Sequence, residues 1–367
     1  MPTTRLMLIG GFLGAGKTTA ILRIAQRLAE RGTRVGLITN DQSVGLVDTA
    51  LLGNQGFPTA EVTGGCFCCK FNSLMEAADK LQQANRPEVF MAEPVGSCTD
   101  LKATVSYPLR RLYGEHYRIA PLSVLMDPVR AMRILGLASG KSFSPKVHYI
   151  YGKQLEEAEI LVINKCDLLD AAKLEELQEA LRSRFPGRPV LSISARQGQG
   201  IDAWLDRLLD TSLGLSPAME VDYDTYAEGE ALLGWLNATA RIAAPAAADG
   251  NAFIQQLGES LRTALEADSF EIAHLKMTLE PDGFGRDLAV ANLVRSGGPL
   301  ELAFRLQEPL SSGVLTLNLR AEADPEVLRG TVLRLLSLPE LSFTIEVDNI
   351  EAFRPGRPTP THRFAQA

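Results

Sequence analysis

The chain has 367 residues, of which 46% are hydrophobic, and this length is enough to bury two separate cores, so we predict two domains. Its net charge of −7 and the lack of a Lys/Arg cluster exclude a surface that would hold a nucleic acid backbone. Neither a secretory signal nor an apolar run of membrane-spanning length is present, so we expect a soluble, cytoplasmic protein that binds neither nucleic acid nor membrane.

Residues 1–212 alternate short apolar runs with stretches of helical spacing. Such runs are typical of buried parallel strands, and the spacing at 21–28 and 174–185 indicates the helices between them. The predicted strands are residues 6–9, 35–39, 89–92, 122–126, 160–163 and 190–193. We therefore predict an α/β domain with a doubly wound, mostly parallel sheet of the P-loop NTPase type, whose ligand lies at the carboxyl ends of the strands.

Residues 11–18 match the phosphate-loop pattern G-x-x-x-x-G-K-[ST], between the first predicted strand and a predicted helix. Glycines allow backbone N–H groups to turn toward phosphates, Lys17 adds a cation for the β and γ oxygens, and the Thr18 hydroxyl can ligate Mg²⁺. The predicted nucleotide contacts from this segment are Gly11, Gly14, Ala15, Gly16, Lys17, Thr18 and Thr19.

A second motif predicts which base is bound. Asn164, Lys165 and Asp167 form Asn-Lys-x-Asp directly after a predicted strand. An Asp carboxylate can accept both N–H donors on the guanine edge, which adenine does not offer, so GTP is favoured over ATP. Ser194 and Ala195 follow the next strand, and we expect their backbone N–H groups to support the base.

Acidic residues at strand ends complete the predicted catalytic set of Lys17, Thr18, Glu93 and Asp41. Glu93 ends an internal strand, where a carboxylate gives a second contact to Mg²⁺, and the N–H of Gly96 can reach a γ-phosphate. Asp41 opens the loop nearest the phosphates and is favoured over Asp48 for orienting the attacking water. Asp127 precedes Pro128, which is typical of a helix N-cap.

Cys66, Cys68 and Cys69 lie within four positions of one another. A capping pattern at 73–76 predicts a helix start nearby, and with Lys70 it should favour the metal-binding thiolate. Three sulfurs with one open position suit a soft or borderline ion, with Zn²⁺ favoured and Co²⁺ as the alternative. Buried packing or a redox role for these thiols stays open, and Cys98 either packs or turns toward the same ion.

The combination of these motifs resembles the CobW-type metal-handling GTPases, relatives of the urease- and hydrogenase-maturation GTPases. The matching residues are 10–19, 64–69, 93–96 and 164–167. The resemblance implies GTP hydrolysis coupled to metal binding and delivery, with the cysteine motif as the metal site. The chain departs from the family pattern at 40–43 and 93–100, and it lacks the His-rich stretch that is frequent in the family.

The second half of the chain predicts a separate domain. Residues 213–250 are rich in Ala, Pro and Gly, which indicates a connecting segment with one strand at 234–242. Residues 251–353 show helices and strands in the order of a split β-α-β, ferredoxin-like α+β domain, and 354–367 are expected to be an extended tail.

These observations favour a GTP-dependent metallochaperone whose second domain contacts a client metalloprotein. One alternative is a GTPase that reactivates or remodels a metal- or corrinoid-dependent enzyme without carrying metal. Another is a GTP-gated regulatory protein in which the cysteines only pack. The sequence names neither the metal nor the client, and it leaves a homo-oligomer open.

Overall fold

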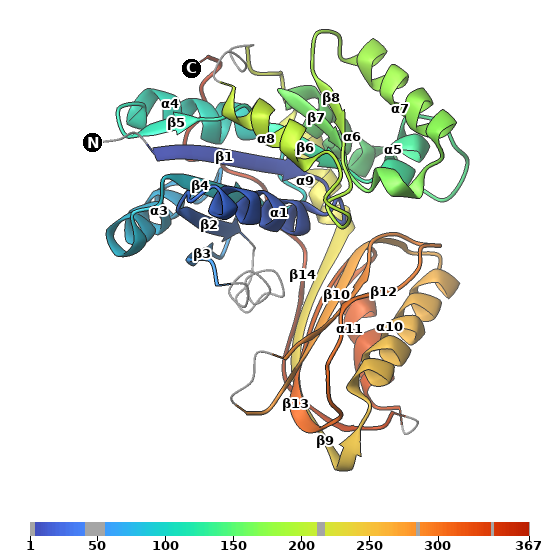
Figure 1. The fold of residues 1–367 in the computed structure, drawn as a ribbon. Coiled ribbons are helices and arrows are strands. Elements are labelled where there is room, and N and C mark those ends of the chain that lie inside the picture. Colours follow the sequence, from blue (N-terminus) through green and yellow to red (C-terminus); the bar gives the residue numbers. More distant parts are fainter. Residues whose placement is uncertain (1–3, 41–55, 211–216, 284–286, 339–340, 367) are drawn as a thin grey trace. The chain divides into compact units, whose positions relative to one another are not determined.

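The computed structural model describes residues 4–40, 56–210, 217–283, 287–338 and 341–366 (Figure 1). The chain forms two compact units. The first unit comprises Met1–Gly229 together with Arg357–Ala367, and the second comprises Glu230–Gly356. Asp41 and Asp48 lie outside the described residues.

A parallel sheet forms the centre of the first unit. Its strands follow the order β3-β2-β4-β1-β6-β7-β8, and β5 pairs with β1. All strand pairings described in this sheet are parallel. The strands are β1 (Thr4–Gly11), β2 (Val35–Asn40), β3 (Thr59–Val62), β4 (Val89–Glu93), β5 (Tyr117–Ile119), β6 (Ser123–Met126), β7 (Ile160–Ile163) and β8 (Val190–Ser192). The predicted doubly wound α/β fold is confirmed, and the order of β4, β1 and β6 places β1 at its centre.

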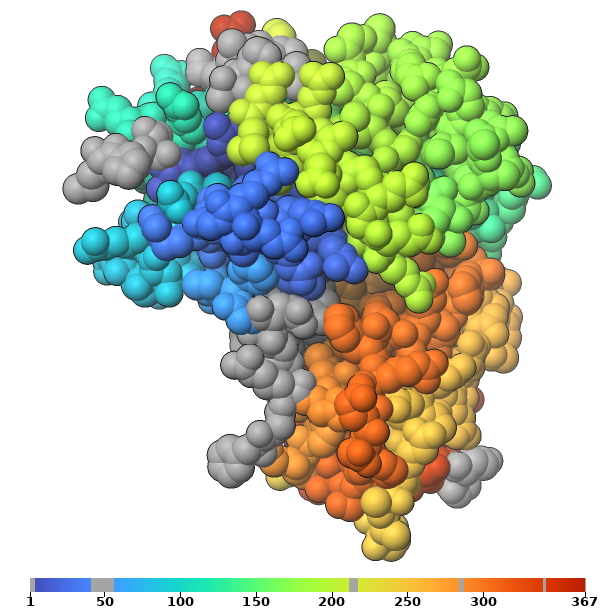
Figure 2. All heavy atoms as spheres, viewed as in Figure 1, coloured from blue at the N-terminus to red at the C-terminus, as the bar shows by residue number. Residues whose placement is uncertain are grey.

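Both faces of this sheet are buried. On β1, Met7 and Ile9 enter one core with α1 and α8, whereas Leu6 and Leu8 are equally buried on the opposite face. Figures 1 and 2 show α1 and α8 side by side, where Arg31, just after α1, pairs with Asp202 of α8 at 3.3 Å. The helices are α1 (Lys17–Glu30), α3 (Phe71–Asn85), α4 (Tyr107–Tyr113), α5 (Pro128–Ile134), α6 (Pro145–Glu157), α7 (Ala171–Arg184), α8 (Ile201–Leu209) and α9 (Tyr223–Leu232).

Two helix starts can be compared with the sequence. Asp127 is the N-cap of α5, as predicted, and its carboxylate accepts the Arg130 N–H at 3.0 Å. The start predicted from Ser73 is wrong, because α3 already begins at Phe71 and no side chain caps it. Among the described residues, none of the helices combines the length and the apolar character needed to cross a membrane.

An antiparallel sheet forms the second unit, in the order β12-β11-β10-β13-β9-β14. Its elements are β9 (Leu233–Ala248), α10 (Gly250–Ala267), β10 (Glu271–Pro281), β11 (Ala289–Leu293), β12 (Glu301–Phe304), β13 (Leu310–Glu322), α11 (Pro325–Leu336) and β14 (Thr344–Phe353). The four strands β10-β13-β9-β14, with α10 and α11, have the expected ferredoxin-like β-α-β-β-α-β order. Two further strands, β11 and β12, continue the sheet beyond β10.

The unit boundaries differ from the expected ones in two places. Residues 213–250 are not only a connection, because β9 is an internal strand paired with both β13 and β14. Its Ala-rich second half looks like a linker in sequence and is mostly exposed, yet it continues the strand. The tail expected at 354–367 belongs to the first unit from Arg357 onward.

Candidate nucleotide and metal site

The phosphate loop connects β1 to α1. Gly14 and Gly16 take left-handed backbone angles, with φ of 77° and 85°, which strongly favour glycine. A side chain at Gly16 would also meet the amide of Asn164, since a Cβ there would lie 2.5 Å from Nδ2. The buried Lys17 ammonium donates to the Gly11 carbonyl at 3.0 Å, so this cation is held inside the loop.

The Thr18 hydroxyl and the Glu93 carboxylate are in contact at the carboxyl end of β4. Thr18 is the second residue of α1 and Glu93 is the last residue of β4, and the Thr18 hydroxyl donates to Oε1 of Glu93 at 3.1 Å. Lys17 lies 3.9 Å from the same oxygen. Two buried oxygen donors beside a phosphate loop are the hard ligands that Mg²⁺ prefers, so these residues fit that ion.

Gly96 packs directly against the phosphate loop. A Cβ at this position would lie 3.0 Å from the backbone nitrogen of Leu13 and closer still to its side chain. The Gln154 amide donates to the Gly96 carbonyl at 2.9 Å and thereby fixes the peptide. The backbone after β4 therefore approaches the phosphate loop as closely as only glycine allows.

Asn164 and Lys165 both contact the phosphate loop. Asn164 donates to the Ala15 carbonyl at 2.8 Å and accepts the Ala195 N–H at 3.1 Å. Lys165 has a left-handed backbone angle, and its ammonium reaches the Gly14 carbonyl at 2.7 Å and the Asp127 carboxylate at 3.0 Å. The two residues join the base-reading motif to the phosphate loop.

Asp167 is the exposed member of this motif, so its carboxylate is accessible to a base. Ser194 and Ala195 are buried, and both of their N–H groups bond within the protein, to the Gln199 carbonyl and to Asn164 respectively. Support of the base by these two N–H groups stays a prediction, as does discrimination between bases by Asp167.

Three thiols form a compact cluster between β3 and α3. The sulfurs of Cys66, Cys68 and Cys69 all lie within 4.8 Å of one another, and Cys66 and Cys69 are 3.3 Å apart. Cys66 and Cys68 are buried, whereas Cys69 is half-buried. Sulfur atoms this close, with no disulfide between them, match the donor set of a thiolate metal site.

The thiols of the cluster differ in pKa. Hydrogen bonds with Cys68, and then with Cys69 and Cys98, lower the pKa of the Cys66 thiol well below its ordinary value. The bond with Cys66 is the largest cause that raises the pKa of Cys69, to about 11. Cys66 is therefore the more acidic of these two thiols, and each thiol that ligates a metal must lose its proton.

Asn40, which the sequence did not assign, and Cys98, whose role it left open, link this cluster to the nucleotide segments. Asn40, the last residue of β2, donates to the carbonyls of Val62 at 2.9 Å and Gly65 at 2.8 Å, and it accepts the Phe67 N–H at 2.8 Å. The buried Cys98 thiol contacts Cys66 from the segment that follows Glu93. The sequence offered one signal for each, a polar residue at a buried strand end and a fourth nearby cysteine.

Replacing Asn40 with alanine should lower the free energy of unfolding by about 2–4 kcal/mol, because three buried hydrogen bonds at the cysteine loop are lost. Denaturant unfolding of the full chain measures this change. Asn85→Ala is the matched control, since Asn85 is exposed at the end of α3. Equal losses in both variants would show that Asn40 does not stabilise the loop.

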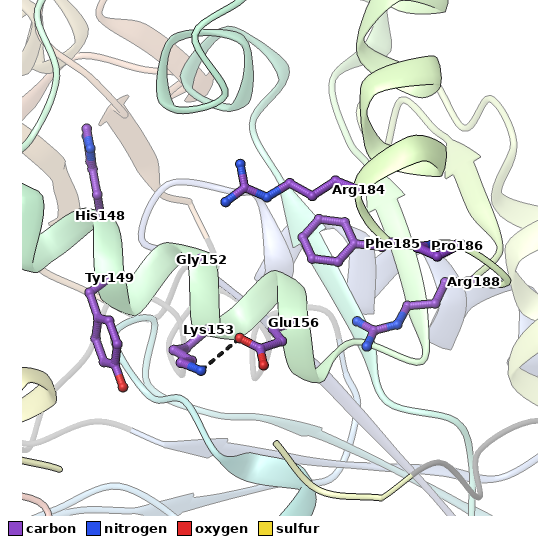
Figure 3. Close-up of a pocket in the computed structure, with 9 residues that line it drawn as sticks. All are labelled: His148, Tyr149, Gly152, Lys153, Glu156, Arg184, Phe185, Pro186 and Arg188. Atoms are coloured by element: carbon purple, nitrogen blue, oxygen red, sulfur yellow. Dashed lines mark hydrogen bonds and ion pairs between the residues drawn. The ribbon is translucent and has the colours of Figure 1, made fainter. Parts of the chain in front are cut away.

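A groove of about 610 Å³ lies elsewhere in the first unit, between α6 and the end of α7 (Figure 3). Its lining includes His148, Arg184 and Arg188, and Lys153 pairs with Glu156 at 2.8 Å. No predicted nucleotide or metal residue lines this groove. The candidate site is therefore the convergence of the phosphate loop, Glu93 and the thiol cluster, not this groove.

A parallel α/β sheet with a phosphate loop after β1 and a base-reading motif after β7 defines a P-loop nucleotide-binding protein. Residues 5–192 match the CobW/HypB/UreG nucleotide-binding domain family, and the chain belongs to this family.

Several relatives share part of this sequence. It is 27% identical to the zinc chaperone CobW of Sinorhizobium sp, over 58% of this chain and 63% of that protein. It is 30% identical to the zinc chaperone YeiR of Escherichia coli K12, over 48% of this chain and 50% of that protein. The chain thus spans between half and two thirds of these relatives. The structure of Zn(II)-bound YjiA GTPase from E. coli aligns with 91% of this chain and 99% of its own, at 17% identity and a TM-score of 0.38.

Proposed function

We propose that this chain is a cytoplasmic GTP-hydrolysing metallochaperone that couples the nucleotide state to the binding and delivery of a transition metal. The observation that carries the proposal is the pair of contacts by which Asn40 and Cys98 join the thiol cluster to the ends of β2 and β4. In the sheet, β4 is the direct neighbour of β1, from which the phosphate loop starts, and β2 is the next strand on the same side. A change at the nucleotide therefore has a short physical route to the sulfurs.

In this proposal, each residue of the nucleotide site has a role. The phosphate loop and Lys17 bind the phosphates, and Asp167 selects guanine. Thr18 and Glu93 would hold Mg²⁺, which supplies charge neutralisation on the phosphates when it is bound. Asp41, in the segment that begins directly after Asn40, is proposed to orient the attacking water.

The cargo is proposed to be Zn²⁺, with Co²⁺ as the alternative, bound by Cys66, Cys68 and Cys69. Thiolate sulfur is a soft donor that suits these ions, and three protein ligands leave a position through which a metal can be passed on. The naming of several relatives as zinc chaperones supports this choice. The second unit is proposed to contact the client metalloprotein.

The proposal is tested by titrating Zn²⁺ and Co²⁺ into the reduced full chain, with and without a non-hydrolysable GTP analogue. One ion per chain is expected to bind, more tightly as pH rises, because bound thiols must lose their protons. The analogue should change the metal affinity by about five- to 150-fold, and metal should change the analogue's affinity by the same factor. Calorimetry measures both.

The matched variant replaces Cys66, Cys68 and Cys69 with serine, and it should lose metal binding while keeping its affinity for the analogue in metal-free buffer. Cys166→Ser is the control, because Cys166 is a buried cysteine outside the thiol cluster, and its replacement should leave metal binding unchanged. Identical metal affinities with and without the analogue would rule out nucleotide-driven transfer. Hydrolysis that responds to a client but not to metal would favour an enzyme-remodelling GTPase.

A further inference from the structure

The last residues of the chain return to the first unit and lie on the cysteine loop. The Thr359 N–H donates to the sulfur of Cys69 at 3.2 Å. The Thr361 N–H donates to the Cys68 carbonyl at 2.8 Å, and its hydroxyl donates to the Cys69 carbonyl at 3.1 Å. Cys69 is the half-buried thiol of the cluster, so this contact falls on its most accessible sulfur.

The same segment is also anchored to residues outside the loop. Arg363 pairs with the Asp100 carboxylate at 2.8 Å, and the Asp100 side chain is only 1% exposed. The Phe364 N–H donates to the Ala103 carbonyl at 2.9 Å. The His362 ring meets Phe71 edge-on, with the ring centroids 5.1 Å apart. An ion pair with a buried carboxylate, a backbone bond and an aromatic contact together fix the position of this segment.

The local sequence suits a backbone donor. Pro358 and Pro360 flank Thr359, and proline favours extended backbone at itself and at the residue before it. An extended segment makes no hydrogen bonds within itself, so its N–H groups point to other partners. His362 is not part of the thiol cluster, since among the described residues only the three cysteines form a metal-binding group there.

We propose that residues 357–364 are part of the metal site, in which the Thr359 amide positions the Cys69 sulfur and the segment covers it against solvent and acceptors. The inference rests on the proposed metal site. An N–H bond to sulfur stabilises the thiolate and fixes its direction, as partners of metal ligands generally do. Metal release to an acceptor then requires the segment to leave Cys69.

Thr359→Pro tests the donor, because proline removes this N–H and fits an extended backbone; the Thr359 hydroxyl, which donates to the Arg357 carbonyl, is lost as well. Thr359→Ala is the matched control, since it keeps the N–H. In the full chain, Thr359→Pro should speed Zn²⁺ release to a chelator by about tenfold. The sulfur-to-cobalt charge-transfer band of its Co²⁺ form should move to longer wavelength, because a sulfur without the hydrogen bond gives up electron density more easily.

Arg363→Ala tests the anchor and should speed Zn²⁺ release in the same direction, whereas Arg363→Lys should restore slow release. In metal-free wild type, the Thr361 N–H should exchange with deuterium more slowly than in Arg363→Ala. A wild type without any cobalt charge-transfer band would overturn the metal site itself. A wild type with that band, but with Thr359→Pro and Thr359→Ala alike in release and in band position, would overturn only the role of the segment.

Discussion

Replacing Lys17 with alanine should reduce GTP turnover by about 100- to 1000-fold, because the site loses a fixed cation at the position where phosphate charge develops. The ammonium is already held by the Gly11 carbonyl, so the wild type does not need to reorganise it when GTP binds. Phosphate release under saturating GTP and Mg²⁺ measures the effect.

Lys80→Ala is the control for this experiment, because Lys80 is exposed on α3, and it should hydrolyse GTP at the wild-type rate. Thermal unfolding of both variants shows whether the fold is retained. A Lys17→Ala chain that is folded and turns over within a few-fold of wild type would disprove the assignment of the phosphate site.

Replacing Asp167 with asparagine should weaken GTP binding by about ten- to a hundredfold and shift preference toward xanthosine triphosphate. The carboxylate accepts two N–H donors from guanine, each such charge-assisted bond contributes about 1.5–3 kcal/mol, and the amide presents a donor to the xanthine carbonyl instead. Competition binding with GTP, ATP and xanthosine triphosphate measures the preference.

Asp170→Asn separates base reading from local stability. The Asp170 carboxylate caps α7 by accepting the Lys173 N–H at 2.9 Å, so its replacement changes the neighbouring helix without touching the proposed base site. This variant should keep the wild-type preference for GTP. If wild type bound ATP as tightly as GTP, guanine selection by Asp167 would be excluded.

The sequence predicted those parts of the fold that depend on local pattern. Continuous apolar runs marked β1, β2, β4, β6, β7 and β8, and Asp127 with Pro128 marked the start of α5. The short strands β3 and β5 were not predicted, because each is only a few residues long and carries polar side chains. The Ala-rich half of β9 has the composition of a linker, and its pairing with a strand distant in the sequence leaves no local pattern that would predict a strand.

The same limit applies to the site. Spacing along the chain was enough to find the phosphate loop, the base-reading motif and the thiol cluster. It did not show that Asn164 holds the phosphate loop, that Asn40 holds the cysteine loop, or that Thr359 reaches Cys69 across 290 positions. Each of these contacts depends on which strand ends and loops the fold brings together.

The return of the chain to the first unit makes the second unit a cassette inserted into the nucleotide domain. Its entry and exit strands are neighbours, since Trp235 of β9 pairs with Phe353 of β14. Cutting the chain after residue 210 would therefore remove α9 and the segment over Cys69 along with the cassette. A minimal nucleotide domain should instead be made by joining Gly229 to Arg357 through a short flexible linker, and exchanging the cassette for that of a relative would test the proposal that the second unit contacts the client.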